Sequence, residues 1–274
     1  MKNLIVLLLL LSPLLSHAQR KPKIKGSRVV TQVKEELPPF NAISLVDDLE
    51  ITLKRSFGPG YSLVADDNLV DILKFEVVDS TLVISSYYTI GSKKQLDIQV
   101  EYTQLRALSL KAGSITSMDV IESDELFVDG FNNARLDLRA QGGVMDINLE
   151  GVSDGNFNVD MDSLKISMGD RAQAYVYTVG QTALLDLVGQ SGLTLEGSLN
   201  RAELRMAGNS KYKGETMEVG DMVLEMEQDP SAHIQAYGHL ELRLKGNSRV
   251  YLLGTPAITL HEFLDTSQLI KQQQ

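Results

Sequence analysis

The stretch that decides the fold occurs twice, as Leu204-Arg205-Met206-Ala207-Gly208-Asn209-Ser210 and as Leu242-Arg243-Leu244-Lys245-Gly246-Asn247-Ser248. Each copy alternates apolar and polar residues and then enters a polar turn centred on glycine. Successive strand residues point to opposite faces, and glycine adopts positive φ without penalty, so the stretch predicts a half-buried strand followed by a tight turn. Such a unit buries its apolar side only by stacking on the next copy, which predicts a repeat architecture.

Versions of this turn recur from residue 105 to 256. They are centred on Gly113, Gly130, Gly151, Gly169, Gly189, Gly208, Gln228 and Gly246, with an average spacing of about 19 residues. Apolar pairs stand four and two residues before most turns, although Leu164 and Ile166 are displaced by one. Six residues after the turns comes another apolar column, consisting of Leu136, Phe157, Tyr175, Leu195, Ile234 and Leu252, with Gly214 as the exception.

These columns predict an all-β protein, a β-solenoid of about eight coils in which each strand pairs with its equivalent in the next coil. In this register Phe157, Tyr175 and Leu195 meet in a dry interior, and Tyr177 also points inward. The expected organisation is a signal peptide at 1–18, a disordered linker at 19–39, an N-terminal β cap with the first strands at 40–104, solenoid repeats at 105–256 and a C-terminal tail at 257–274. Both ends need covering, because unpaired strand edges recruit other chains.

The N-terminus predicts export. A positive Met1–Asn3, an apolar run from Leu4 to Leu15 and the small-x-small Ser16-His17-Ala18 are typical of a secretory signal peptide cleaved after Ala18. No later run approaches the roughly 18 consecutive apolar residues of a membrane helix, so no transmembrane segment is expected in the mature chain. The expected location is the periplasm, the cell surface or the medium.

Composition excludes several kinds of chemistry. Cysteine is absent, so the chain has neither disulfides nor a thiol nucleophile. A net charge of -10 argues against binding to nucleic acid, which requires clustered Lys and Arg.

Metal binding is not expected either. The segment Asp154–Asp162 carries oxygen-bearing side chains at alternate positions, but Val159 and Lys165 stand where a calcium EF-hand loop needs Gly and Glu. Its alternation with apolar residues predicts a strand with a polar outer face. The histidines of the mature chain show no metal-ligand spacing: His233, His239 and His261. No metal or cofactor is assigned.

Paired carboxylates on neighbouring coils would suit glycan cleavage. The candidates are Asp137, Glu150, Asp160 and Asp162. Sugar-cleaving sites commonly add exposed aromatic rings, whereas this chain lacks Trp and the register above turns Tyr175 and Tyr177 inward. We therefore assign no catalytic residue and expect a protein that is not an enzyme.

Several segments together resemble the head GIN domain family of autotransporter adhesins over about residues 38 to 257. They are Phe40-x-x-Ile43, the strand region Asp71 to Ser85, the recurring apolar-x-apolar-x-Gly-x-Ser units, and the closing Ser248 to Pro256. The resemblance implies an exported bacterial protein with a β-solenoid body and an adhesin-like role, and it supplies no catalytic residues. Turns at Gln228 and at Gly130-Phe131-Asn132 depart from the Gly-Ser pattern.

The expected function is therefore non-catalytic binding by the faces of a solenoid at the envelope of a Gram-negative bacterium, with an unknown surface protein or glycan as partner. Two alternatives stay open. One is a carbohydrate-active enzyme, a glycan lyase or hydrolase on a β-helical scaffold, and the other is a structural envelope protein that assembles end to end. The binding residues and the oligomeric state are left unassigned.

Overall fold

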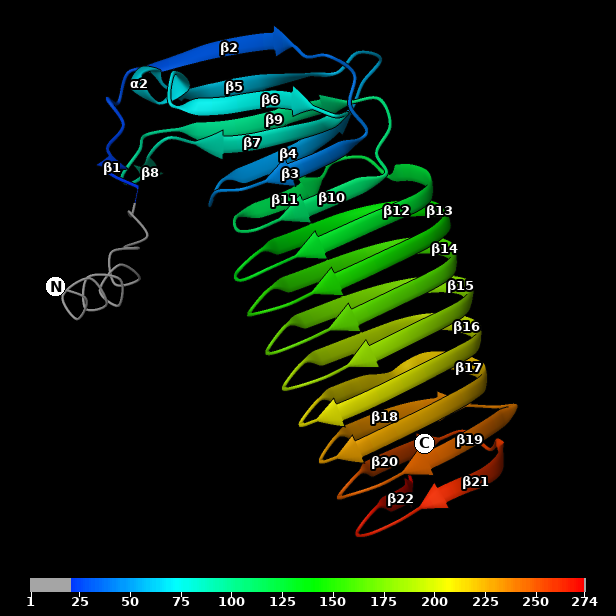
Figure 1. Cartoon of the computed structure of the whole chain (residues 1–274). Helices are drawn as coiled ribbons and strands as arrows, with labels where there is room; N and C mark the ends of the chain where they lie inside the picture. The colour runs from blue at the N-terminus through cyan, green and yellow to red at the C-terminus, as the bar shows by residue number, and fades with distance from the viewer. Residues whose placement is uncertain (1–20, 274) are drawn as a thin grey trace, which may run out of the picture.

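The computed structural model describes residues 21–273, and the predicted signal peptide lies outside them. The chain is nearly all β and winds into parallel coils of about nine turns, with a cap at the N-terminal end (Figure 1). No helix among these residues is long and apolar enough to span a membrane. The cap and first coil contain β1 (Lys23–Ile24), β2 (Val30–Glu36), β3 (Ala42–Leu45), β4 (Glu50–Arg55), β5 (Gly60–Asp66), α2 (Asp67–Val70), β6 (Leu73–Val78), β7 (Thr81–Ser86), β8 (Thr89–Ile90) and β9 (Leu96–Tyr102).

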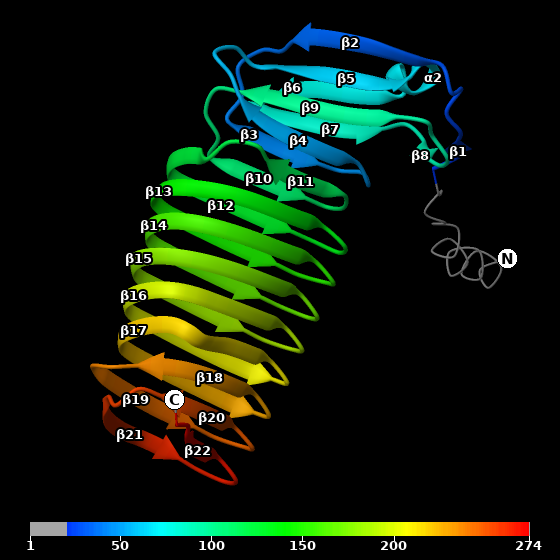
Figure 2. The ribbon, with the colours of Figure 1, turned by 180° about the vertical axis from the view of Figure 1, so that it is seen from behind.

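The remaining coils are built from thirteen strands. They are β10 (Ala107–Leu110), β11 (Ser114–Ser117), β12 (Ile121–Gly130), β13 (Arg135–Leu149), β14 (Asp154–Met168), β15 (Gln173–Leu187), β16 (Gly192–Gly208), β17 (Lys211–Gln228), β18 (Ser231–Ala236), β19 (His239–Leu244), β20 (Arg249–Leu253), β21 (Ala257–Phe263) and β22 (Gln268–Lys271). Each of β13 to β17 bends midway, so that one strand supplies both walls of a coil (Figure 2).

We call the half that follows each turn the first wall and the half that precedes the next turn the second wall. Through the first wall β4 pairs with β11, and β11 pairs with the start of β13. Through the second wall β3 pairs with β10, β10 with the end of β12, and β12 with the end of β13. All of these pairings are parallel, and the apolar columns meet between the walls.

The turns form a column of residues with positive φ. Among residues 21–273, the column consists of Gly113, Asn132, Gly151, Asp170, Gly189, Gly208, Gln228, Gly246 and Asp265. Two predicted turn centres were wrong: Asn132 holds the conformation expected of Gly130, and Asp170 holds that expected of Gly169. Asn and Asp are the residues after glycine that best tolerate this backbone region, because their short side chains hydrogen-bond locally.

Because this turn is centred on Asp170 and not on Gly169, the inward and outward sides of β15 are the opposite of those predicted. Val176, not Tyr175, pairs with Phe157 on one side and Leu195 on the other. Tyr175 and Tyr177, predicted to point inward, lie on the outer surface with 41% and 43% exposure. The two-residue error at Asn132 has no such effect, because strand side chains repeat every two residues.

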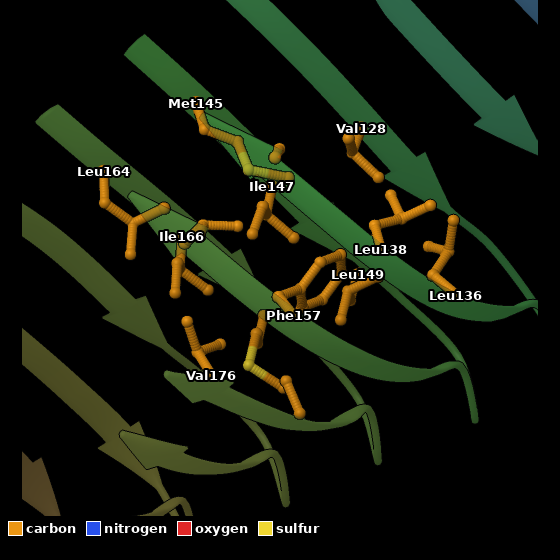
Figure 3. Close-up of a cluster of buried hydrophobic side chains, with 14 of the residues drawn as sticks. Val128, Leu136, Leu138, Met145, Ile147, Leu149, Phe157, Leu164, Ile166 and Val176 are labelled. Atoms are coloured by element: carbon orange, nitrogen blue, oxygen red, sulfur yellow. The ribbon is translucent and has the colours of Figure 1, made fainter. Parts of the chain in front are cut away.

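Buried apolar side chains of neighbouring coils, Phe157 and Val176 among them, fill the space between the walls (Figure 3). Large and small residues change places between coils. In β14 the inward pair is Gly155 and Phe157, whereas in β17 it is Tyr212 and Gly214, and all four are buried. A Cβ on Gly214 would lie 2.6 Å from the Tyr212 ring. The apparent exception at Gly214 is therefore the space that Tyr212 needs.

The cap continues both walls upward from the first coil. Along the first wall, β4 pairs with β9, β9 with β5, and β5 with β2, the last two pairings being antiparallel. Along the second wall, β3 pairs with β7, and β7 pairs with β6 in the antiparallel sense. Leu69 of α2 is buried above this end of the core. The expected linker thus contains two strands, β1 and β2, that the sequence pattern missed.

Residues 257–274 were expected to be a tail, but β21 and β22 within this segment add another coil. β21 pairs in parallel with β19, and β22 pairs with β20. Ile258 and Leu260 continue the core columns of Leu240 and Leu242, yet they are 44% and 52% exposed.

Candidate binding surface

The outer side of the first wall carries two exposed tyrosines at its centre. Tyr175 lies in register between Asn156 of β14 and Thr194 of β16. Tyr177 lies between Asn158 and Glu196 in the same way. We call these six residues, Asn156, Asn158, Tyr175, Tyr177, Thr194 and Glu196, the tyrosine platform.

One direct hydrogen bond orders the platform. The hydroxyl of Tyr175 donates to Glu196 Oε2 at 2.9 Å, so the ring leans toward the next coil. This hydrogen bond raises the pKa of Tyr175, because the nearby carboxylate favours the protonated phenol. The phenol therefore stays neutral at physiological pH, and Tyr175, Asn156 and Asn158 are all exposed to solvent.

The polar rows beside the platform are also linked between coils. Asn156 Nδ2 donates to Asp137 Oδ1 at 3.2 Å. Since the backbones of β13 to β16 are paired nearly throughout these rows, the side chains project from a stiff sheet. Sites carried on such a scaffold need little ordering when a ligand binds.

A second aromatic pair lies further along the row that contains Tyr175. That row continues through Thr194 and Lys213 to His233 and Tyr251. The His233 and Tyr251 rings are stacked, with centroids 4.4 Å apart. His233 Nδ1 also lies 2.8 Å from Glu215 Oε1. The first wall therefore presents aromatic rings at two places along the solenoid axis.

The second wall has a different surface, a row of alternating charges. Asp186, Arg205, Glu225 and Arg243 follow one another in register across four coils. Arg243 Nη1 lies 2.8 Å from Glu225 Oε1, and Arg205 Nε lies 3.7 Å from Glu225 Oε2. These charges satisfy one another, which leaves this wall less available for a charged ligand.

Among the open hollows on the surface of residues 21–273, two lie at positions that bear on a binding or catalytic site. One, of about 740 Å³, follows the turn column and is lined by residues that include Asn132, Asp170 and Arg171. The other, of about 1120 Å³, lies at the corner near the cap and is lined by residues that include Glu122, Asp124, Glu125 and Asp160. Two of these carboxylates are paired: Arg55 with Glu122 and Arg106 with Glu125, each at 2.6 Å.

The four candidate carboxylates are exposed and are not gathered into one site. Asp160 reaches the corner hollow, where its neighbours in register are Gln141 and Val179. Asp137 lies in another row, against Thr116 and Asn156. Glu150 comes directly after the end of β13, and Asp162 lies at the bend between the two halves of β14. Sequence reasoning missed Glu122, Asp124 and Glu125, which precede the regular part of the repeat.

The metal-like segment is the first half of β14, with its oxygen-bearing side chains outward and Phe157 and Val159 inward. No group of three or more His, Asp or Glu suited to a metal ion occurs in the part of the chain that the structure describes. Each of the three histidines contacts a carboxylate of the preceding coil: His233 with Glu215, His239 with Asp221 and His261 with Glu241.

Comparison with known proteins gives a family match over most of the chain. The family described as "Putative auto-transporter adhesin, head GIN domain" matches residues 39–256. No curated protein matches the chain.

Several solved structures share the fold. A putative adhesin from Parabacteroides merdae ATCC 43184 is 16% identical, with a TM-score of 0.67 over 92% of this chain and 100% of the other. A putative adhesin from Parabacteroides distasonis ATCC 8503 is 16% identical, with a TM-score of 0.66 over 91% and 97%. A putative lipid binding protein from the same strain is 15% identical, with a TM-score of 0.62 over 92% and 100%. At these identities the likeness shows a shared fold.

Proposed function

The chain belongs to the head GIN domain family of auto-transporter adhesins, and from this membership and the geometry above we propose that it is an exported, non-catalytic binding protein. It binds a ligand of the cell surface or its surroundings through the flat outer side of its first wall. The observation that carries the proposal is the exposure of Tyr175 and Tyr177 on a wall of continuously paired strands. Large exposed aromatic side chains are characteristic of binding surfaces.

The shape of the wall supports binding to an extended partner. Neighbouring coils are about 4.8 Å apart, so a row of equivalent side chains presents contacts at a fixed interval along the axis. Many such contacts engaged together give strong attachment even when each is weak. A flat surface of this kind suits a polymer or another surface better than it suits an enclosed small molecule.

Adhesion can be tested with the fluorescently labelled mature chain, residues 19–274. We expect saturable binding to intact bacterial cells or to mucin-coated surfaces, with competition by unlabelled chain. Thr194→Arg, which places a long charged side chain on the first wall, should reduce this binding, whereas Thr182→Arg on the second wall should not. Absence of saturable binding to every surface tried would contradict the proposal. Fractionation of the producing cell tests the proposed export.

A second candidate function, glycan cleavage, is favoured by the corner hollow with its four carboxylates. In such an enzyme one carboxylic acid protonates the leaving oxygen and a second carboxylate activates water or attacks the sugar. Asp124 and Asp160 are the pair to test, because Glu122 and Glu125 are engaged by arginines. An enzyme would release reducing ends from polysaccharides, and Asp160→Asn would abolish that release.

A further inference from the structure

We propose that the tyrosine platform binds neutral glycan chains by stacking sugar rings on Tyr175 and Tyr177. This inference rests on the proposed binding function and names its ligand class. The two rings stand two residues apart on β15, on the same outer side, so their attachment points are about 7 Å apart. A pyranose ring presents C–H groups on its face and hydroxyl groups at its edge, which matches an aromatic ring surrounded by polar side chains.

The residues around the rings supply the hydrogen bonds that sugar hydroxyls need. Asn156 and Asn158 offer both donors and acceptors, Thr194 offers a hydroxyl, and Glu196 accepts. Hydroxyl groups donate and accept in turn, so a mixed set of carboxamide, hydroxyl and carboxylate satisfies them. Purely apolar partners would leave these polar groups without hydrogen bonds and would therefore bind less well.

The charge at the platform selects against acidic glycans. The direct neighbours of the two rings, in register and along β15, are Asn156, Asn158, Thr194, Glu196, Gln173 and Val179. Glu196 is the charged member of this set, and the cationic side chains of Arg139 and Lys213 lie one coil further out, in register with Asn158 and Thr194. Uronic acids, sialic acids and sulfated sugars would meet repulsion at the Glu196 carboxylate, because like charges in contact disfavour binding.

The second aromatic pair favours a chain over a single sugar. His233 lies three coils beyond Tyr175 in the same row, which corresponds to about 14 Å along the axis. Thr194 and Lys213 lie between them, so this path crosses a hydroxyl and one cationic side chain that lies beyond the direct neighbours of the two tyrosine rings. A glycan lying along β15 covers Tyr175 and Tyr177, whereas one that runs along the solenoid axis from Tyr175 reaches the His233–Tyr251 stack. In either direction two weak contacts on one chain reinforce each other.

The test measures retention of the mature chain in native gels that contain a neutral polysaccharide (dextran, yeast mannan, xyloglucan or laminarin) or an anionic one (polygalacturonate or hyaluronan). We expect retention by at least one neutral polymer and by neither anionic polymer. The double variant Tyr175→Ala/Tyr177→Ala should weaken retention at least about tenfold, the loss expected when aromatic stacking is removed. Tyr175→Phe/Tyr177→Phe keeps the rings and should stay within about threefold of the parent.

Phe57→Ala is the matched control, because Phe57 is a fully exposed aromatic side chain at the cap, away from the platform. It should leave retention unchanged, and thermal melting of each variant verifies that the fold is kept. The proposal is overturned if no neutral polymer retains the chain, if only an anionic polymer does, or if the Ala double variant is retained like the parent. Saturable cell binding that survives the Ala double variant would leave the adhesive function standing and overturn the platform alone.

Discussion

A Cβ atom on Gly155 would lie 2.3 Å from Cε2 of Phe157, two residues further along β14. The two residues share the inward side of one coil, and the absence of a side chain at Gly155 is what admits the Phe157 ring. In the next coil the equivalent inward positions hold two side chains of intermediate size, Ala174 and Val176. In each of these coils a larger side chain at one inward position is accompanied by a smaller one at the other, as expected of a close-packed core.

Gly155→Val should therefore overpack the core and lower the free energy of unfolding by about 1–3 kcal/mol. The double variant Gly155→Ala/Phe157→Val reproduces the pair found in β15 and should recover part of that loss. Gly169→Ala is the control, because its Cβ would meet nothing closer than 3.9 Å. Urea denaturation measures all three variants, and a Gly155→Val protein as stable as the parent would refute the packing argument.

The turn column gives a second prediction. Gly189 has φ of +73°, and its Cβ would lie 2.9 Å from the carbonyl oxygen of Asp170. Gly189→Ala should cost about 1–2 kcal/mol, because an L-residue with an alkyl side chain is strained in this region. Gly189→Asn should cost less, since Asn132 already occupies the equivalent position. Equal destabilisation of both variants in urea melts would show that steric contact, not backbone conformation, sets the cost.

Asp66 gives a prediction about pH. Its side chain is fully buried and accepts hydrogen bonds from the backbone N–H groups of Arg28, Lys94 and Gln95 at 3.1–3.2 Å. Burial acts to raise the pKa of Asp66, but the three donors outweigh it and hold the pKa below its ordinary value. Folding therefore favours the carboxylate, and its contribution is full above the unfolded pKa of about 3.9 and is lost as pH falls through the folded pKa.

Asp66→Asn should accordingly reduce stability at pH 7 and flatten the dependence of the melting temperature on pH below about 4. Gly26→Ala should disturb the same site, because its Cβ would lie 1.8 Å from Asp66 Oδ2. Asp79→Asn, at an exposed turn, is the control. An Asp66→Asn protein whose acid profile matches that of the parent would contradict the role assigned to the three donors.

The charge row of the second wall should contribute little. Arg243 and Glu225 are 39% and 37% exposed, so their attraction is screened by solvent. Arg243→Ala should cost less than about 1 kcal/mol, and that cost should shrink as NaCl is raised, since salt screens exposed ion pairs. The check is thermal or urea unfolding at low and high salt. A larger cost that does not respond to salt would indicate that packing of the arginine stem dominates.

The repeat itself could be predicted from local pattern. Alternation with a period of two indicates strands, and a turn about every 19 residues indicates stacked coils, because both signals depend only on neighbours in the chain. The all-β class, the parallel stacking, and the burial of Phe157 and Leu195 were confirmed for this reason. The structure explains the displaced pair Leu164 and Ile166: counted from Asp170, the apolar pair four and two residues before the turn is Ile166 and Met168.

Tertiary structure alone decided which side of β15 faces the solvent. The turn could be centred on Gly169 or Asp170, and glycine is the better local candidate, but stacking on the turns of neighbouring coils places the positive φ at Asp170. A shift of one residue reverses every side chain of a strand, so this choice moves Tyr175 and Tyr177 from the core to the surface. The sequence by itself determined that the chain coils, whereas packing between coils determined what the coil presents to its partners.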